Sequence, residues 1–107
     1  MNKTYKHWKR KKVNLIKSFC RDFGIEIAVK NTKAFTSSAY MRLQKGDQII
    51  VIRIANHKQK RFYGDQRQQI DFEILFSDNN WRDCIGLLCN VFELQLTKRW
   101  INELERR

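Results

Sequence analysis

The sequence contains no proline, no internal repeat and no low-complexity segment. Because linkers between domains are commonly built from such stretches, nothing along the chain predicts a domain boundary. We therefore expect one domain over residues 1–107. A chain of this size buries roughly 65% of its unfolded surface around a single core. Hydrophobic residues make up 42% of the chain, which is typical of a globular protein and not of a disordered one.

Long hydrophobic runs are also missing. No segment approaches the ~20 apolar residues that cross a bilayer. The N-terminus is charged, but no apolar stretch follows it, which argues against a secretory signal. The three cysteines, Cys20, Cys84 and Cys89, are odd in number and lie in apolar, helix-like contexts. We expect free, buried thiols and a cytoplasmic location, because that compartment keeps thiols reduced.

Acidic residues are scarce in the first two thirds of the chain. Residues 1–23 hold eight Lys and Arg against one acid, and residues 24–68 hold nine against three. Residues 69–107 hold five against seven, so the net charge of +11 is concentrated before residue 69. A surface that serves only solubility mixes the two signs. Segregated charge predicts one basic face that meets a polyanion, and we expect that polyanion to be nucleic acid, DNA or RNA.

Hydrophobic spacing predicts an α+β fold. Residues 4–22 place their apolar side chains within an arc of about 160° on a helical wheel, and Gly24 follows as a helix-ending glycine. The remaining elements are strands over 25–30, 39–43, 48–55 and 69–76, a tight turn over 44–47, and helices over 80–92 and 97–107. We expect an antiparallel meander of three to four strands, flanked by one N-terminal helix and one or two C-terminal helices in a two-layer sandwich.

The first candidate site is the N-terminal helix, whose cations form a run and a flank. The run consists of Lys9, Arg10, Lys11 and Lys12. The flank, read on a helical wheel, consists of Lys3, Lys6, Arg10, Lys17 and Arg21. Repulsion between neighbouring cations would be relieved by a phosphate backbone. A merely solvated helix flank is the alternative, and the charge of the whole basic two thirds favours polyanion binding.

The second candidate site is the segment between the third and fourth strands. It interleaves cations, which hold phosphates, with rings on which bases stack. The residues assigned to this part of the interface are Lys58, Lys60, Arg61, Tyr63 and Arg67. Trp8 and Phe62 are further candidates for stacking on bases. The alternative is a surface loop with Phe62 or Tyr63 tucked into the core.

No pattern in the sequence predicts catalysis. Asp71 and Glu73 are two apart on a strand and share a face, so with Asp65 they could hold Mg²⁺ in a nuclease. Ordinary polar alternation on an exposed face is the better explanation. No nucleophile signature surrounds a cysteine, and Cys84 and Cys89 have the wrong spacing for a zinc knuckle. We expect no enzyme, no metal and no cofactor.

The last third of the chain holds Trp81, Phe92 and Trp100 among acidic residues. We expect these aromatic side chains to cover the sheet. An exposed Trp in this region would instead point to a protein partner or to a homodimer.

The order of elements resembles the double-stranded-RNA-binding domain. That family carries a Lys-rich run at the start of its second helix, which grips phosphates across a groove. The corresponding stretch here is Asp78-Asn79-Asn80-Trp81-Arg82-Asp83, which has the wrong sign. No residue is therefore carried over from that family.

A second resemblance covers residues 37–58. Ser38-Ala39-Tyr40 and Ile52-Arg53-Ile54-Ala55-Asn56-His57 are similar to the S-x-Y and I-R-I-x-x-H strands of small bacteriophage and mobile-element proteins. The resemblance implies a phage accessory protein and an anti-CRISPR-like inhibitor of host defence. Such an inhibitor would bind a nucleic-acid-handling protein, and its basic face would occupy a groove meant for DNA or RNA.

Overall fold

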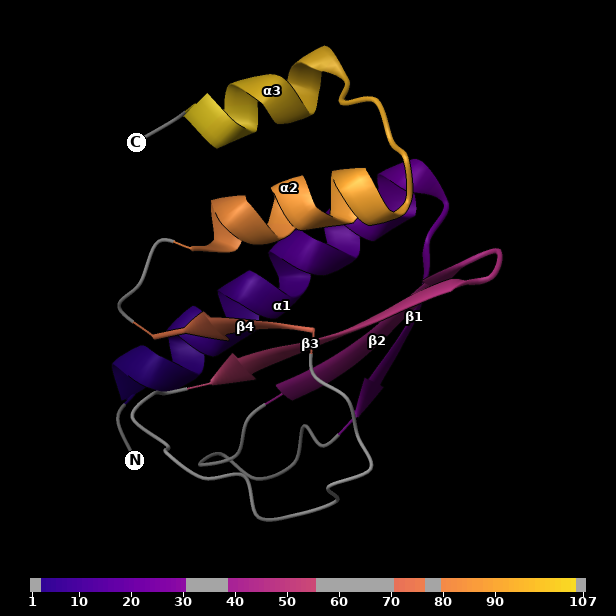
Figure 1. The fold of residues 1–107 in the computed structure, drawn as a ribbon. Helices are drawn as coiled ribbons and strands as arrows, with labels where there is room; N and C mark the ends of the chain where they lie inside the picture. The colour runs from indigo at the N-terminus through magenta and orange to yellow at the C-terminus, as the bar shows by residue number, and fades with distance from the viewer. Residues whose placement is uncertain (1–2, 31–38, 56–70, 77–79, 106–107) are drawn as a thin grey trace.

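The structure, a computed structural model, describes residues 3–30, 39–55, 71–76 and 80–105. Its elements are α1 (Lys3–Phe23), β1 (Glu26–Lys30), β2 (Ala39–Lys45), β3 (Gln48–Ala55), β4 (Phe72–Leu75), α2 (Trp81–Val91) and α3 (Lys98–Glu105). The strands form one mixed sheet, with α1 and α2 against one face and α3 beyond α2 (Figure 1). The predicted α+β class, with one helix before the strands and two after them, is confirmed. Within the described ranges, no helix combines the length and apolar character needed to cross a bilayer.

The direction of β4 departs from the prediction. β1, β2 and β3 are antiparallel neighbours, as a meander requires. β4 lies beside β3 but runs parallel to it, with Phe72 opposite Ile52 and Leu75 opposite Ala55. A fully antiparallel meander is therefore wrong for this pair. Alternation along a strand identifies the residues that share a face but not the strand's direction, whereas a parallel partner needs a connection of about a dozen residues or more.

The β2–β3 hairpin closes through a two-residue turn at Gly46 and Asp47. Lys45 pairs with Gln48 across its base. Gly46 has φ of 63°, the left-handed conformation that hairpin turns of the primed types need at their first central residue. The Gln44 side chain donates a hydrogen bond of 3.1 Å to the Gly46 carbonyl. The predicted turn is confirmed, and its short length fixes the register of the two strands.

Gly24 ends α1, as the sequence predicts, with φ of 70°. The Ile25 N–H donates to the Cys20 carbonyl at 2.9 Å, and the Gly24 N–H donates to the Arg21 carbonyl at 3.4 Å. These are the two bonds of a Schellman motif. Ile25 and Cys20 are both buried, so an apolar contact accompanies the turn that leads the chain into β1.

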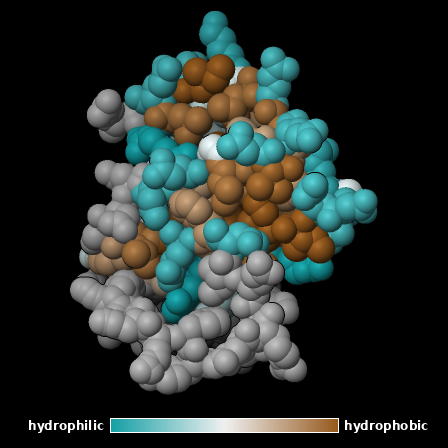
Figure 2. Space-filling model, in the orientation of Figure 1, coloured by the Kyte–Doolittle hydropathy of each residue, from teal (hydrophilic) through white to brown (hydrophobic). Residues whose placement is uncertain are grey.

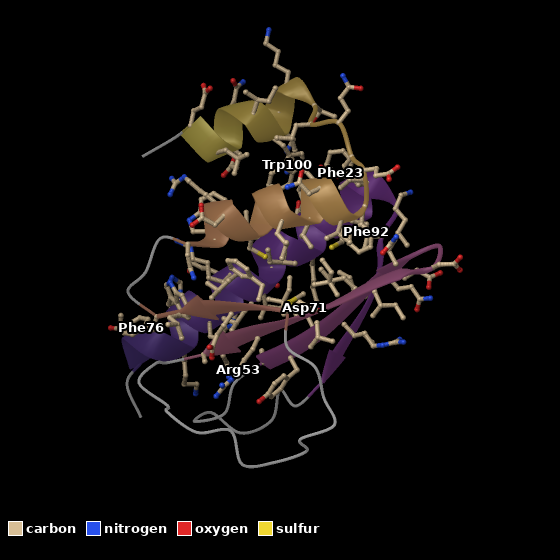
Figure 3. All side chains as sticks on the ribbon, in the orientation of Figure 1. Phe23, Arg53, Asp71, Phe76, Phe92 and Trp100 are labelled. Carbon is tan, nitrogen blue, oxygen red and sulfur yellow. The ribbon has the colours of Figure 1, made fainter. Side chains whose placement is uncertain are left out.

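The core lies between the sheet and the helices that cover it. Its largest fully buried side chains are Ile16, Phe19, Cys20, Met41, Leu43, Ile52, Ile54, Ile74, Ile85, Leu88 and Trp100. They come from α1, from one face of the sheet, and from α2 and α3. Phe23, Phe92 and Trp100 gather where α1 and α2 end (Figure 3). The apolar stripe predicted for α1 is thus the side by which this helix packs.

β3 is buried on both of its faces. Its helix-facing residues are Ile50, Ile52 and Ile54, and its other residues in this stretch are Val51, Arg53 and Ala55. No member of either set is more than 9% exposed. These six residues form an apolar run that only Arg53 interrupts, and such near-continuous runs are typical of strands covered on both faces. The result is that one arginine lies inside the sheet.

α3 is attached to the end of α1 through Trp100. The Trp100 ring packs edge-on against Phe19 with 5.1 Å between centroids, and its Nε1 donates to Asp22 Oδ2 at 2.8 Å. Arg99 Nη1 lies 2.6 Å from the same carboxylate oxygen. Trp81 and Trp100 are only 8% and 1% exposed. The expectation that these aromatic side chains belong to the core is confirmed. Neither Trp81 nor Trp100 presents an exposed ring that would point to a protein partner.

Candidate nucleic-acid interface

Four cations of α1 form a line on its exposed side. We name this set the basic flank; it consists of Lys6, Arg10, Lys17 and Arg21, all exposed. At 100° per residue the four lie within about 60° of arc. Lys3 begins the helix, and its side chain lies outside the described part of the structure. Because the buried stripe of α1 occupies other positions on the wheel, the basic flank faces solvent.

Within the part of the chain that the structure describes, no acid neutralises the basic flank. Asp22 is the one acid of α1, and its carboxylate accepts from Arg99 and from Trp100. Arg21 reaches the Ser18 hydroxyl at 3.4 Å. Two ion pairs between described residues, Arg53–Glu73 and Arg99–Asp22, contain no member of the flank. A line of cations without counter-charges repels itself and attracts polyanions.

The run at residues 9–12 is divided by the helix. Arg10 and Lys11 are exposed, whereas Lys9 and Lys12 are half-buried. Burial lowers the pKa of the Lys9 ammonium, and the neighbouring charge of Lys6 lowers it further. Consecutive residues on a helix point about 100° apart, so a run of four cannot share one face. Arg10 belongs to the basic flank, Lys11 projects about 80–140° away from the flank cations, and the other two lie at the edge of the core.

Lys12 belongs to a cluster around Trp81. Its Nζ lies 5.2 Å from the centroid of the Trp81 ring, and the Arg82 guanidinium lies 4.5 Å from the same centroid. Cations over an indole face are attracted by the ring quadrupole. Burial lowers the pKa of Lys12, followed by the charges of Lys11 and Arg82. Arg82 Nε also donates to the Leu104 carbonyl at 2.8 Å, so the cluster joins α1, α2 and α3.

A shallow hollow lies at the N-terminal end of the basic flank. Its volume is about 460 Å³, and its lining includes Thr4, Lys6, His7 and Arg10. The first turn of α1 contains no acid. The positive end of the helix dipole lies at this terminus. The hollow therefore combines two cations, a hydroxyl and an imidazole in a region that favours anions.

Trp8 is not available to stack on bases from the flank. It is half-buried, and its ring meets Phe76 edge-on with 5.2 Å between centroids. On the wheel Trp8 lies with the apolar stripe, which explains why it packs against the end of β4. The basic flank therefore meets its ligand without this ring.

The second candidate site lies outside the described residues. It comprises Lys58, Lys60, Arg61, Tyr63 and Arg67, together with Phe62. Its part in the interface stays a prediction from the sequence.

Two of the carboxylates considered for a metal, Asp71 and Glu73, are engaged in the sheet, and Asp65 lies outside the described residues. Asp71 Oδ2 accepts from the Val51 N–H at 3.1 Å, and the Asp71 N–H donates to the Val51 carbonyl at 2.9 Å. Glu73 pairs with Arg53 at 2.9 Å. Among the described residues, no group of three His, Cys, Asp or Glu side chains is arranged to hold a metal ion. Both carboxylates therefore stabilise the β3–β4 pair.

The two strands of the bacteriophage-like pattern are neighbours in the sheet. Tyr40 lies opposite Arg53 in the β2–β3 register, and the guanidinium lies 5.9 Å from the centroid of the tyrosine ring. Burial raises the pKa of Tyr40; the charge of Arg53 opposes this rise and that of Glu73 adds to it. Because Arg53 is only 8% exposed and paired with Glu73, its charge is compensated inside the protein.

The three thiols are poor nucleophiles. Burial raises the pKa of Cys20 to about 12, and burial together with the nearby Cys20 raises that of Cys84 to about 12. Burial also raises the pKa of Cys89. The thiolate is the reactive form of cysteine. The structure thus agrees with free buried thiols, with Cys89 half-buried.

The face that carries α2 and α3 has a different character. Hydrophobic side chains reach the surface there between hydrophilic ones (Figure 2). In α3, Ile101 is 43% exposed, and Glu105, four residues further along the helix, is exposed as well. α2 carries the exposed Asp83. The charge that is segregated along the sequence is thus carried by α1, which is strongly basic, whereas α2 and α3 contain basic and acidic residues in equal numbers.

Two residues of functional interest were passed over in the sequence. Asn14 is exposed and lies between Arg10 and Lys17 along the helix axis. On the helical wheel it lies about 20–80° from the four cations, and this position could have identified it as a neighbour of the basic flank. Arg53 is the buried cation of β3. The available signal was its position within the apolar stretch Ile49–Ile54, since near-continuous apolar runs are typical of strands covered on both faces.

Comparison of the chain with known protein families, with curated proteins and with solved structures finds no match.

Proposed function

We propose that this protein binds nucleic acid, without catalysing a reaction, through the basic flank of α1. The observation that carries the proposal is the line formed by Lys6, Arg10, Lys17 and Arg21, exposed and without an acidic partner among the described residues. Such a line neutralises phosphates and releases their counterions. Lys6 and Arg10 also line a shallow hollow at one end of the flank. The net charge of +11 supplies long-range attraction.

The proposal predicts binding with a strong dependence on salt. If the four cations each neutralise one phosphate, log K falls with log[salt] with a slope of about −3.6 for duplex, from about −0.9 per phosphate. Electrophoretic mobility shift across a salt series measures this slope. The variants Lys6→Gln/Arg10→Gln and Lys17→Gln/Arg21→Gln should each reduce its magnitude by about 2.

Arg42→Gln/Lys45→Gln is the matched control. Both side chains are exposed and belong to β2, and Arg42 alternates with Met41 and Leu43, which face the helices. This variant removes the same charge as either flank variant but from another part of the molecule. Equal losses of slope in all three variants would show that net charge alone acts, and no binding at about 50 mM salt would remove the proposal.

The inhibitor hypothesis makes a different prediction for the same preparations. A phage-type inhibitor would retain a protein partner from a bacterial lysate after nuclease treatment, and would bind free DNA or RNA weakly. Capture that disappears on nuclease treatment supports nucleic-acid binding. A partner that survives nuclease and is lost in the flank variants would assign the flank to a protein.

A further inference from the structure

The basic flank consists of two pairs of cations, and on this side of the helix the exposed residue between them is Asn14. Lys6 and Arg10 are one pair and Lys17 and Arg21 the other, each with its members four residues apart. At 1.5 Å per residue, the members of a pair are about 6 Å apart along the axis, and the two pair centres about 16 Å apart. Each pair can therefore meet a different stretch of phosphate backbone.

Asn14 lies between the two pairs along the helix axis. It is exposed and lies four residues after Arg10 and three before Lys17, so it shares their side of the helix. An asparagine amide offers a donor and an acceptor side by side, which match N7 and N6 of adenine in the major groove. An exposed amide between two cation pairs is thus a base-reading group between two phosphate-holding groups.

The shape of this surface distinguishes between nucleic acids. The major groove of B-form DNA is about 12 Å wide and admits an α-helix, with a phosphate backbone on each side. The major groove of A-form RNA is too narrow for side chains to read. Proteins that bind single strands stack the bases on aromatic side chains. The four residues of the basic flank have no ring, and the His7 imidazole lies at the edge of the flank.

We infer that α1 lies in the major groove of duplex DNA, with the basic flank on the phosphates of both strands and the Asn14 amide against an adenine edge. This inference rests on the proposed function and names its substrate class. α1 suits the role because it has 21 residues, about 31 Å of helix, which is long enough for both pairs to reach the groove walls while the other side packs on the sheet.

The test compares probes of one length at one salt concentration. Fluorescence anisotropy is measured with a duplex DNA, the duplex RNA of the same sequence and each DNA strand alone. We expect duplex DNA to bind at least about tenfold tighter than the others. Equal or tighter binding of the RNA duplex or of single strands would overturn the inference while leaving the proposed function intact. No binding of any probe would overturn both.

A second measurement examines the base contact. A library of random duplex DNA is selected on the wild-type protein and on Asn14→Ala, with Asn102→Ala as control, since Asn102 is also an exposed helical asparagine. Wild type and Asn102→Ala should enrich an adenine at one position, and Asn14→Ala should not. Replacing that adenine by 7-deazaadenine, which lacks the N7 acceptor but keeps the N6 amino group, should weaken wild-type binding by about 2- to 12-fold, the range for one hydrogen bond.

The same substitution should leave binding by Asn14→Ala unchanged. Enrichment that persists in Asn14→Ala, or an unaltered affinity of the wild type for the 7-deaza duplex, would show that Asn14 does not read a base in the major groove. Circular dichroism verifies the helix content of each variant, because alanine at an exposed helical position preserves or raises helix propensity.

Discussion

Glu93 has a left-handed backbone, with φ of 54°. It follows α2 at the position where a glycine is usual. The Leu94 N–H donates to the Cys89 carbonyl at 2.9 Å, and the Glu93 N–H donates to the Asn90 carbonyl at 3.4 Å. The pattern repeats that at the end of α1, where Gly24 takes the same role. A side chain in this conformation is strained, because Cβ crowds the following carbonyl.

The first prediction follows from this contrast. Glu93→Gly should stabilise the protein by about 1 kcal/mol, because glycine adopts the left-handed region without the steric penalty. Gly24→Ala should destabilise it by about 1–2 kcal/mol, although a Cβ there would meet no atom within 4 Å. Urea unfolding followed by circular dichroism measures both. A lower urea midpoint for Glu93→Gly would contradict the assignment of strain to this residue.

The buried thiols make stability depend on alkaline pH. The pKa of Cys20 and that of Cys84 are each raised to about 12 from 9.0. Above pH 9 the unfolded chain loses these protons while the folded chain keeps them. The contribution of the neutral thiols is thus fully present below pH 9 and is lost as the pH rises toward 12.

The second prediction is a decrease in unfolding free energy between pH 8 and pH 10.5, with each buried thiol contributing about 1–2 kcal/mol. The pH dependence should be shallower in Cys84→Ala, because this variant has one fewer buried proton to release. Cys89→Ala is the control, since Cys89 is half-buried. Urea midpoints at the two pH values measure the effect; parallel pH profiles for wild type and Cys84→Ala would refute it.

At the scale of elements, the spacing of apolar residues predicted the bounds of helices and strands well where those bounds depend on residues close together in the sequence. The helix predicted over 4–22 is Lys3–Phe23, and the strand predicted over 48–55 is Gln48–Ala55. Both depend on the spacing of apolar residues and on Gly24 and Gly46 beside them. The strand predicted over 69–76 is shorter, Phe72–Leu75, and its direction was wrong. Direction is set by where the chain re-enters the sheet, which is a property of tertiary structure.

The attachment of α3 depends on Asp22, and this is the third prediction. Asp22→Asn should destabilise the protein by about 1–2 kcal/mol, because the Trp100 N–H loses a charged acceptor. Hydrogen exchange of the α3 amides should rise more than that of the β3 amides. The Trp100 ring keeps its packing on Phe19, so the rest of the fold should persist.

Arg99→Gln separates the two partners of Asp22. The Arg99 side chain is 61% exposed, so its ion pair with Asp22 is worth less than about 1 kcal/mol. This variant should leave exchange in α3 nearly unchanged. If Arg99→Gln loosened α3 as strongly as Asp22→Asn, the ion pair rather than the indole hydrogen bond would hold the helix.

At the scale of the whole molecule, the sequence predicted where four of the cations lie. The wheel placed Lys6, Arg10, Lys17 and Arg21 on one side of a helix, and the structure exposes all four. The run alone did not predict that Lys12 lies against Trp81 and beside Arg82, because this contact depends on α2 packing against α1. Contacts between segments far apart in sequence decide such cases.

The parallel pairing of β3 with β4 also bears on the order in which the molecule assembles. β2 and β3 are adjacent in the chain and close through a two-residue turn, and a hairpin of this kind forms within about 1–10 μs. β4 pairs with β3 only after a much longer closure, which is slower because its contacts are non-local. We therefore expect α2 and α3 to join last, and pulse-labelled hydrogen exchange showing β4 protected before β2 would exclude this sequence of events.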